Sequence, residues 1–459
     1  MLKKIGAALC IIGLLAMLAI PYYKKNNQVD NEKMQEEIIE NVQINLFTFD
    51  PNSISRIEIK DEKALILHKQ DERWSDIEHE KLNYDNQVIE NFIRTVNALE
   101  TTEVIYNSID PNKYGIDDTS RIITLYDEAN NNYTLRVGSQ TLDKMGRYLG
   151  THLDEKLYVV KSEAAASLLQ TRDALIEKKI YMPWQVDPQD IKILKKNEPA
   201  IHIQKNPKVG YVDHEKWLLE GFFKQSHELD TETTEGIIGQ ILAFEKDQFV
   251  GSKENLEAYG LDDPQLTITI NNEWTMAFGA KENEWVYFMT ADDPYVYKML
   301  EEKLSVVNHI KPIALIRKQV YIPDLSQLSQ ITITNPGRTL VLDLKKETTE
   351  NEAMHLTGVI EGIALDNDKT GELIELIQNG VSIEAVLQNP DIEKRQERKA
   401  EITIRYLFET EEAKLIELIP YDNQFYILRL DGMIEFAVGK QPVMNMLNIL
   451  YETLKTSQQ

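Results

Sequence analysis

Hydrophobic and polar residues alternate in short runs along much of this chain, which is the pattern of β-strands with one buried face. The first two runs contain Ile57 and Ile59, then Leu65 and Leu67. Further runs of the same period occur at Ile123 and Leu125, at Tyr133, Leu135 and Val137, at Tyr148, and at Leu157 and Val159. Turn-forming residues separate the runs, so the pattern predicts short strands in a mostly antiparallel sheet.

A helix is predicted between these two groups of strands. Asp85 is a residue type that caps helix N-termini, and the apolar residues at offsets of 7, 8 and 11 from it lie on one helical face. These offsets lead from Asp85 to Phe92, Ile93 and Val96, from Asp230 to Ile237, Ile238 and Ile241, and from Asp366 to Leu373, Ile374 and Ile377. One long amphipathic helix is therefore expected in each of three places, and a shorter closing helix is expected near residues 164–169.

The recurrence of this pattern indicates three copies of one unit. An aspartate recurs at Asp50, Asp187 and Asp324 with a spacing of 137, and an aromatic residue at Tyr148, Tyr287 and Tyr426 with a spacing of 139. Residues 174–183 and 314–323 are identical at six of ten positions. We predict three tandem α+β repeats, each a mostly antiparallel sheet with one long and one short helix. They are placed at residues 46–183, 184–321 and 322–459.

The first residues have the composition of a membrane anchor. Lys3 and Lys4 precede the uncharged residues 5–23, which would rise about 28 Å as a helix and so match a bilayer core. We predict a single N-terminal transmembrane helix within residues 1–25, followed by a polar juxtamembrane spacer at 26–45. A cleaved signal peptide is the alternative, although small residues at the −3 and −1 positions of a cleavage site are hard to find.

Charge places the remaining chain outside the cytoplasm. The chain carries 50 basic and 75 acidic residues, a net charge of −25, and without the four lysines of residues 1–25 the net charge is −29. Anionic cytoplasmic headgroups would repel such a body, so we expect a cell-membrane protein with an extracytoplasmic C-terminal body. The acidic balance also argues against nucleic acid as a partner. With one cysteine, Cys10, the chain has no intrachain disulfide or thiolate metal cage.

The sequence contains no motif of a known catalytic or cofactor site. It has no Gly-x-Ser-x-Gly elbow, phosphate-binding loop or dinucleotide fingerprint, and no two histidines are spaced to share one helix or strand face. An EF-hand pattern that begins at Asp110 fails at Tyr114 and Arg121, its fifth and twelfth positions. We therefore predict a protein that is not an enzyme and has no cofactor, metal site or catalytic residue.

A tight turn recurs in two repeats, at residues 114–117 and 259–264. Its glycine permits positive φ, its tyrosine is expected to pack over the turn, and a proline leads into the next strand. The predicted turn residues are Tyr114, Gly115, Tyr259, Gly260, Asp262 and Pro264. We interpret this element as structural, with a ligand-contacting loop as the alternative.

The tryptophans fall into two groups. Trp74 and Trp217 occupy equivalent positions in two repeats, which predicts packing under the sheet. The other tryptophans are not shared in this way, and two of them, with two tyrosines, are the expected contacts if one surface binds glycan or peptide by stacking. These predicted binding residues are Trp274, Trp285, Tyr287 and Tyr295.

Together with residues 46–51 (Leu-Phe-Thr-Phe-Asp-Pro), Trp74 and residues 147–149 (Arg-Tyr-Leu), these elements resemble the bacterial DUF4340 family over about residues 46–310. The third repeat has a charged stretch at 391–399 near the position of the turn, so its resemblance rests on spacing. Members of the family are often associated with ABC transporters of the gliding-motility auxiliary type, and their biochemical activity is unknown. The resemblance therefore implies an accessory role at the cell surface and implies no catalytic residues.

Three functional hypotheses follow. The first is a non-enzymatic, membrane-anchored extracytoplasmic accessory or interaction protein beside an ABC transporter, whose permease and ATPase are separate partner chains. The second is a substrate-binding module for glycan, lipid or peptide at the cell envelope. The third is a cell-envelope hydrolase with a carboxylate site between repeats.

Overall fold

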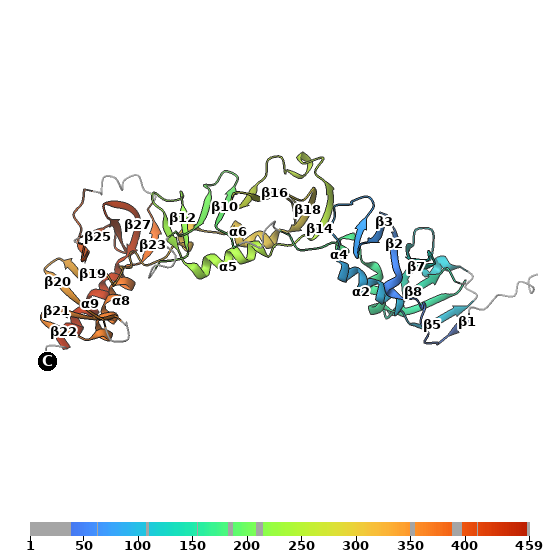
Figure 1. Ribbon diagram of the computed structural model, residues 1–459, viewed down its shortest axis with the longest axis horizontal. Helices are drawn as coiled ribbons and strands as arrows, with labels where there is room; N and C mark the ends of the chain where they lie inside the picture. Colours follow the sequence, from blue (N-terminus) through green and yellow to red (C-terminus); the bar gives the residue numbers. More distant parts are fainter. Residues whose placement is uncertain are drawn as a thin grey trace, which may run out of the picture. The chain divides into compact units, whose positions relative to one another are not determined.

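The computed structural model describes nine segments of the chain (Figure 1). They are residues 38–61, 63–106, 110–153, 155–181, 187–207, 214–348, 354–387, 397–410 and 412–456. The predicted transmembrane helix at 1–25 lies outside these segments, and no helix within them is long and apolar enough to cross a membrane. The chain divides into two compact units, one up to Lys178 and one from Lys179 onward.

The first unit contains a nine-stranded sheet whose described pairings are all antiparallel. The strand order is β1 (Ile38–Glu40), β5 (Thr101–Tyr106), β9 (Leu157–Lys161), β8 (Gly146–Thr151), β7 (Asn132–Gln140), β6 (Arg121–Asp127), β2 (Ile54–Lys60), β3 (Leu65–Gln70) and β4 (Arg73–Asp76). After the meander β2–β4 the chain crosses to the far edge as β5, then returns to β2 through β6. The strands predicted from alternation are therefore confirmed.

The second unit contains two further nine-stranded antiparallel sheets. One has the order β13 (His227–Leu229), β12 (Trp217–Glu220), β11 (Ile201–Lys205), β10 (Asp190–Lys195), β15 (Leu266–Ile270), β16 (Trp274–Glu282), β17 (Trp285–Thr290), β18 (Tyr295–Leu300) and β14 (Gln248–Ser252). The other has the order β22 (Ile363–Leu365), β21 (Met354–Ile360), β20 (Arg338–Thr348), β19 (Leu328–Asn335), β24 (Ile402–Phe408), β25 (Ala413–Pro420), β26 (Phe425–Leu430), β27 (Met433–Gly439) and β23 (Ile383–Val386). Eight strands keep one order in all three sheets, so the prediction of three tandem α+β repeats is confirmed.

The three long helices begin where the aspartates predict. They are α2 (Asn86–Asn97), α5 (Thr231–Leu242) and α8 (Asn367–Gly380), and the side chains of Asp85, Asp230 and Asp366 accept hydrogen bonds from backbone N–H groups in their first turns. The next side chain also has a repeated role: Asn86 accepts from Trp74 N at 3.1 Å, and Thr231 accepts from Lys216 N at 3.0 Å. Each helix start is thereby tied to the edge of its meander.

The closing helices match the prediction in the first two repeats and differ in the third. The first repeat has α3 (Ser162–Ala166) and the 3-10 turn η3 (Ser167–Leu169), and the second has η5 (Glu301–Leu304) and α6 (Ser305–Asn308). The third has α9 (Lys440–Thr456), whose 17 residues exceed the 14 of α8. Its buried residues recur at helical spacing and it packs on α8, where Gly380 makes room for Met446.

The similar junctions, 174–183 and 314–323, are explained by contacts to the helix caps. A short helix, α4 (Arg172–Leu175) or α7 (Pro312–Leu315), ends each of the first two repeats. The carbonyl of Leu175 accepts from Asp85 N at 2.9 Å, and that of Leu315 accepts from Asp230 N at 2.8 Å. The first two repeats therefore each close on the start of their own long helix.

The folded body begins earlier than the predicted spacer allows. Strand β1 lies within residues 26–45 and pairs with β5, and Ile44 O accepts from Thr101 N at 2.9 Å. Ile38 and Ile39 are consecutive and do not alternate with polar residues, so the sequence gives no strand signal here and only the pairing with β5 reveals the strand.

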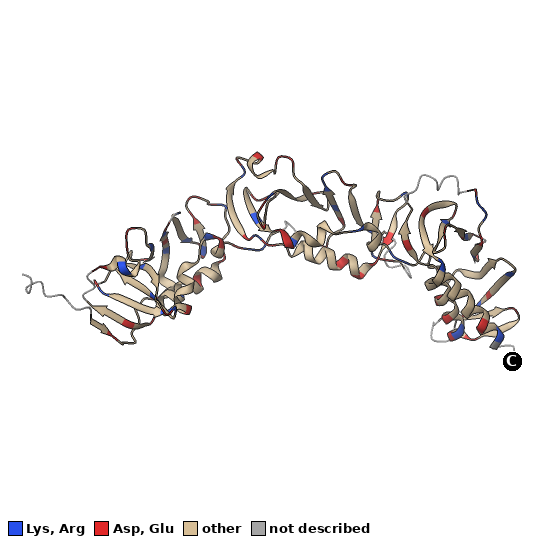
Figure 2. Cartoon of the chain, turned by 180° about the vertical axis from the view of Figure 1, so that it is seen from behind, with Lys and Arg blue, Asp and Glu red and all other residues tan. Residues whose placement is uncertain are grey.

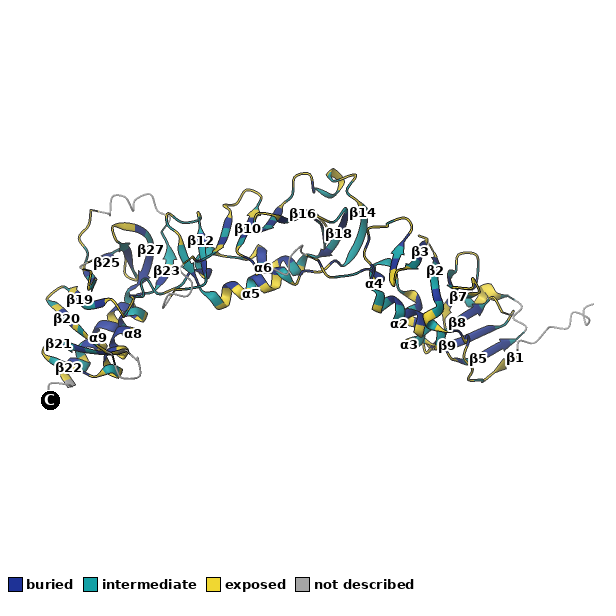
Figure 3. Ribbon diagram, viewed as in Figure 1, coloured by how far each residue is buried: buried dark blue, intermediate teal, exposed yellow. Residues whose placement is uncertain are grey.

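The sheets bury both faces, one more extensively than the other. The long helix covers one face (Figure 3). Trp74 and Trp217 are buried, as predicted. A smaller cluster of Ile105, Ile116 and Leu157 covers the opposite face of the first sheet, and Leu261, Ala277 and Val296 form its counterpart in the second. Residues 114–116, which precede β6, and residues 256–261, which precede β15, therefore lie over the second face.

Candidate functional site

The recurring tight turn has the predicted geometry. Gly115 follows η2 (Pro111–Tyr114) with φ 69°, and Gly260 follows η4 (Glu257–Tyr259) with φ 61°. The ring of Tyr114 lies 4.7 Å from that of Tyr148. In the second repeat, Tyr259 lies 4.9 Å from Tyr287, and the exposed Asp262 and half-buried Pro264 lead from the turn to β15.

Two glycines that sequence reasoning missed seat this turn against the sheet. A Cβ atom on Gly138 would lie 2.4 Å from Tyr114 O, and one on Gly279 would lie 2.2 Å from Tyr259 O. Both glycines occupy irregular positions, where the register between β7 and β8 or between β16 and β17 shifts. The spacing of 141 residues between Gly138 and Gly279 is the sequence signal that could have identified them as equivalent positions of two repeats. The turn is therefore part of the fold in both repeats.

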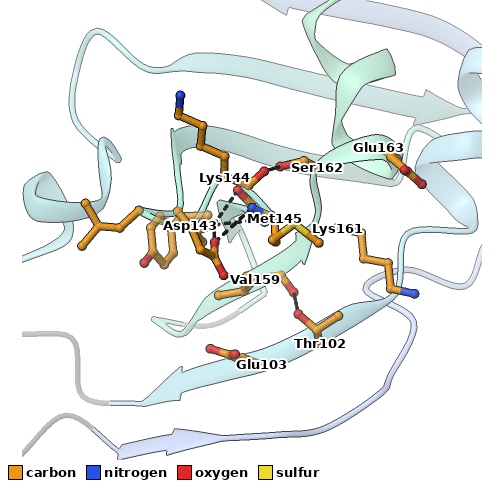
Figure 4. A pocket seen from close by; sticks show the side chains of 13 residues that line it. Thr102, Glu103, Asp143, Lys144, Met145, Val159, Lys161, Ser162 and Glu163 are labelled. Carbon is orange, nitrogen blue, oxygen red and sulfur yellow. Dashed lines mark hydrogen bonds between the residues drawn. The ribbon is translucent and has the colours of Figure 1, made fainter.

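A pocket of about 790 Å³ lies on the first unit, beside the smaller cluster of Ile105, Ile116 and Leu157 (Figure 4). It is lined by β5, β8, β9, the start of α3, and residues 141–145, which we call the β7–β8 loop. Val159 and Gly146 are buried in it. Its rim contains charged side chains of both signs, namely Glu103, Asp143, Lys144, Lys161 and Glu163.

The β7–β8 loop is held by hydrogen bonds to itself and to neighbouring elements. The Thr141 hydroxyl donates to Asp143 Oδ1 at 2.5 Å, and Met145 N donates to the same oxygen at 3.0 Å. These two donors hold the pKa of Asp143 below its usual range, the hydroxyl more than the N–H. Lys144 adopts φ 63°, and its carbonyl accepts from Ser162 Oγ at 2.9 Å. The loop therefore has a defined shape without a ligand.

This shape exposes two apolar side chains beside the pocket. Leu142 is fully exposed, and Met145 is 73% exposed. Below them, burial raises the pKa of Tyr148, and the carboxylates of Glu103 and Asp143 raise it further. Among the residues that the structure describes, the rim groups Glu103, Lys144, Lys161 and Glu163 form no ion pair.

The loop that forms the pocket wall differs between the repeats. In the second sheet, only Asn283 and Glu284 separate β16 from β17, so the hairpin has no loop of comparable length. In the third, residues 421–424 join β25 to β26, and Asp422 accepts from Gln424 N and Phe425 N. Features shared by all repeats serve the fold, so a feature confined to one repeat is the better candidate for function.

The four predicted binding aromatics do not form one surface. Trp274 is 1% exposed and Tyr295 is 8% exposed, because both lie on the helix-covered face of their sheet with Phe278. Trp285 and Tyr287 lie on the opposite face and are half-buried. Tyr287 also has Lys298 Nζ 4.7 Å from its ring centroid. The prediction of a ligand contact is therefore wrong for Trp274 and Tyr295, and it stays a prediction for Trp285 and Tyr287.

A smaller pocket of about 180 Å³ lies within the second unit, between its two sheets. His227 is 2.9 Å from a carboxylate oxygen of Glu435, whereas both oxygens of Glu228 are occupied, one by His214 and the other by Arg317. These contacts join β13 to β27 and to the junction after α7. Within the described part of the chain, no group of three or more His, Cys, Asp or Glu residues is arranged to hold a metal ion.

Tyr321 lines this smaller pocket, and because of it we predict that the second unit becomes less stable to unfolding at alkaline pH. Burial raises the pKa of Tyr321 to about 12, whereas an unfolded tyrosine titrates near 10. The contribution of Tyr321 to the free energy of unfolding is complete below pH ~10. It is lost as pH rises toward 12, because over this range the tyrosine of the unfolded state has released its proton while that of the folded state still holds it. Tyr321→Phe keeps the ring contact with Tyr406, so we expect the alkaline unfolding midpoint to rise by about a few tenths of a pH unit. Circular dichroism against pH measures this, and an unchanged midpoint contradicts it.

Acidic and basic side chains are interspersed over both units (Figure 2).

Comparison with known proteins identifies the family of the chain. The domain of unknown function DUF4340 matches residues 74–216 and 224–400, which are 320 of the 459 residues. The first match is one repeat long, since it begins at Trp74 and ends beside its counterpart Trp217, and the second continues into the third sheet. No curated protein and no solved structure matches the chain. Because the two matches cover well over half of its length, the protein belongs to the DUF4340 family.

Proposed function

We propose that this protein is a non-enzymatic, membrane-anchored accessory protein that binds a partner protein through the first-repeat pocket. Its N-terminal segment would hold it at the cell membrane as a single span, with the body on the extracytoplasmic side. The partner we expect is the permease subunit of an ABC transporter, whose ATPase is a further chain. The anchor rests on residues 5–23, and the partner class rests on the family resemblance.

The shape of the β7–β8 loop supports this proposal best. A set of hydrogen bonds within the loop and to its neighbours holds it, and it nevertheless directs Leu142 and Met145 into solvent. Exposed apolar side chains in a fixed geometry are typical of a protein contact, because little conformational entropy remains to be lost on binding. Burial of these two side chains would contribute about 1.5–3 kcal/mol each.

The rim of the pocket favours a protein partner over a small ligand. Both signs of charge surround it, with Glu103 and Glu163 beside Lys144 and Lys161. Such a mixed, wet rim around an apolar centre is the arrangement of protein interfaces. A small-molecule site would instead enclose most of its ligand, and this pocket is open to solvent along its rim.

Affinity purification of the full chain from membranes in mild detergent tests the proposal. We expect the wild type to recover a permease subunit, and Leu142→Asp or Met145→Asp to reduce that recovery by roughly tenfold or more. Ile77→Asp is the matched control, because Ile77 is also exposed on the first unit but lies outside the pocket. Recovery of the wild type alone, or equal recovery with all three variants, would refute the proposed docking.

A second candidate function, glycan or peptide binding by the second repeat, is favoured by one observation. Trp285 and Tyr287 are two residues apart on β17 and therefore point to the same face, where both are partly exposed. Titration of tryptophan fluorescence with soluble cell-wall fragments would detect such binding, and it should be lost in Trp285→Ala.

We do not propose a hydrolase, because the lining of the pocket between the second and third sheets includes one carboxylate, Glu228, whose oxygens are both bound.

A further inference from the structure

Exposed aliphatic side chains gather at one end of the first sheet. Ile38 and Ile39 of β1 are 56% and 59% exposed, and Leu153, in the turn between β8 and β9, is 61% exposed. We call these three residues and the adjoining Lys156 the edge-strand patch. Of the thirteen large hydrophobic residues that are exposed in the described chain, eight belong to the first unit.

Strand register places the members of the patch at one end of the sheet, with Ile38 and Ile39 on its two faces because they are consecutive in β1. Ile38 pairs with Tyr106 on β5, and Lys156 Nζ lies 5.2 Å from the ring centroid of Tyr106. Leu157 pairs with Gly150 on β8, so the turn that contains Leu153 projects from the same end of the sheet. With strands about 4.8 Å apart, Ile38 and Leu153 lie within about 15 Å of each other.

The chain length before β1 keeps this patch close to the bilayer. Residues 26–37 are the twelve that separate the predicted anchor from Ile38, and fully extended they span at most about 43 Å. The patch is therefore the first part of the folded body that the tether presents to the membrane, at a high effective concentration.

We propose that the edge-strand patch inserts into the interfacial region of the bilayer that holds the anchor. The proposal rests on the anchor of the proposed function and concerns a surface at the opposite end of β8 from the partner-binding loop. Ile38, Ile39 and Leu153 supply the apolar contact, while Tyr106 and Lys156 have amphipathic side chains that suit the headgroup level.

The charge of the patch predicts which lipids it contacts. Exposed Glu40 and Glu155 flank it and offset the charge of Lys156. Attraction to anionic lipid is therefore weak, and apolar insertion drives the contact. We expect the same contact with phosphatidylcholine vesicles as with vesicles that also contain phosphatidylglycerol.

A fluorescent probe at position 153 tests the insertion in the full chain. In a Cys10→Ser background, which removes the natural cysteine, Leu153→Cys is labelled with an environment-sensitive dye and reconstituted into vesicles with or without lipids brominated near the headgroup. We expect roughly twofold or greater quenching by the brominated lipid, and little at Leu142→Cys. That control site is more exposed, but it lies about 20 Å away at the other end of β8.

Mutation and flotation complete the test. Ile38→Asp with Ile39→Asp should reduce quenching at position 153 by roughly half or more, while circular dichroism verifies the fold. If the protein floats with vesicles but position 153 is not quenched, the patch proposal is overturned and the anchor stands. If the protein does not float, the anchor fails, and the patch proposal fails with it. Quenching that requires phosphatidylglycerol would overturn apolar insertion as the cause.

Discussion

Gly279→Val should destabilise the second unit by about 3 kcal/mol or more, because the first carbon of the new side chain would lie 2.2 Å from the carbonyl oxygen of Tyr259. A backbone atom cannot rotate away as a flexible side chain does, so the turn at Gly260 must leave the sheet. Hydrogen exchange of peptides from β16 and β17 measures the effect. We expect the same result for Gly138→Val in the first unit, where the contact is to Tyr114 O at 2.4 Å.

Gly236→Ala is the matched control. Gly236 lies in α5 with nothing within 4 Å of the added carbon, so alanine should stabilise the helix by about 0.5–1 kcal/mol. If Gly279→Val and Gly236→Ala have similar effects on exchange, the turn does not depend on the glycine beneath it.

Asp76→Ala should cost the first unit about 3–5 kcal/mol, because Asp76 is 1% exposed and balances a mostly buried guanidinium. Its carboxylate lies 3.0 Å from an Arg172 nitrogen and accepts from the Tyr84 hydroxyl at 3.0 Å. Burial raises the pKa of Tyr84, and the charge of Asp76 raises it further, so that phenol stays a donor. Alanine would remove the buried carboxylate that the Tyr84 hydroxyl and Arg172 share, and it would weaken the attachment of α4 to the meander.

Hydrogen exchange of peptides from β4 and α4 measures this loss of stability in the first unit separately from the second unit. Glu90→Ala is the control, since the exposed pair of Glu90 with Arg94 on α2 should contribute about 0.5 kcal/mol or less. A loss confined to that size in Asp76→Ala would mean that water replaces the carboxylate at Arg172 and Tyr84.

The candidate site was much less accessible to sequence reasoning than the fold. Comparison of the repeats located the turn glycines Gly115 and Gly260, but it emphasised residues that the copies share. The β7–β8 loop has no counterpart in the second repeat, and the corresponding residues 421–424 of the third differ from it in sequence, so no internal comparison pointed to Leu142 or Met145. Trp274 and Tyr295 show the opposite difficulty: tryptophan and tyrosine suit both a core and a binding surface, and only the face of the strand decides between them.

Local chemistry in the sequence determined the strands, the three helix starts at Asp85, Asp230 and Asp366, and their order in three repeats. Period-two alternation and N-caps act over a few residues, and repetition made each signal visible three times. Only the tertiary structure decided the features that depend on contacts between segments far apart in the sequence. It placed β1 beside β5, allowed α9 to lengthen against α8, and seated the turns on Gly138 and Gly279, because each of these requires contact with a surface built from distant parts of the chain.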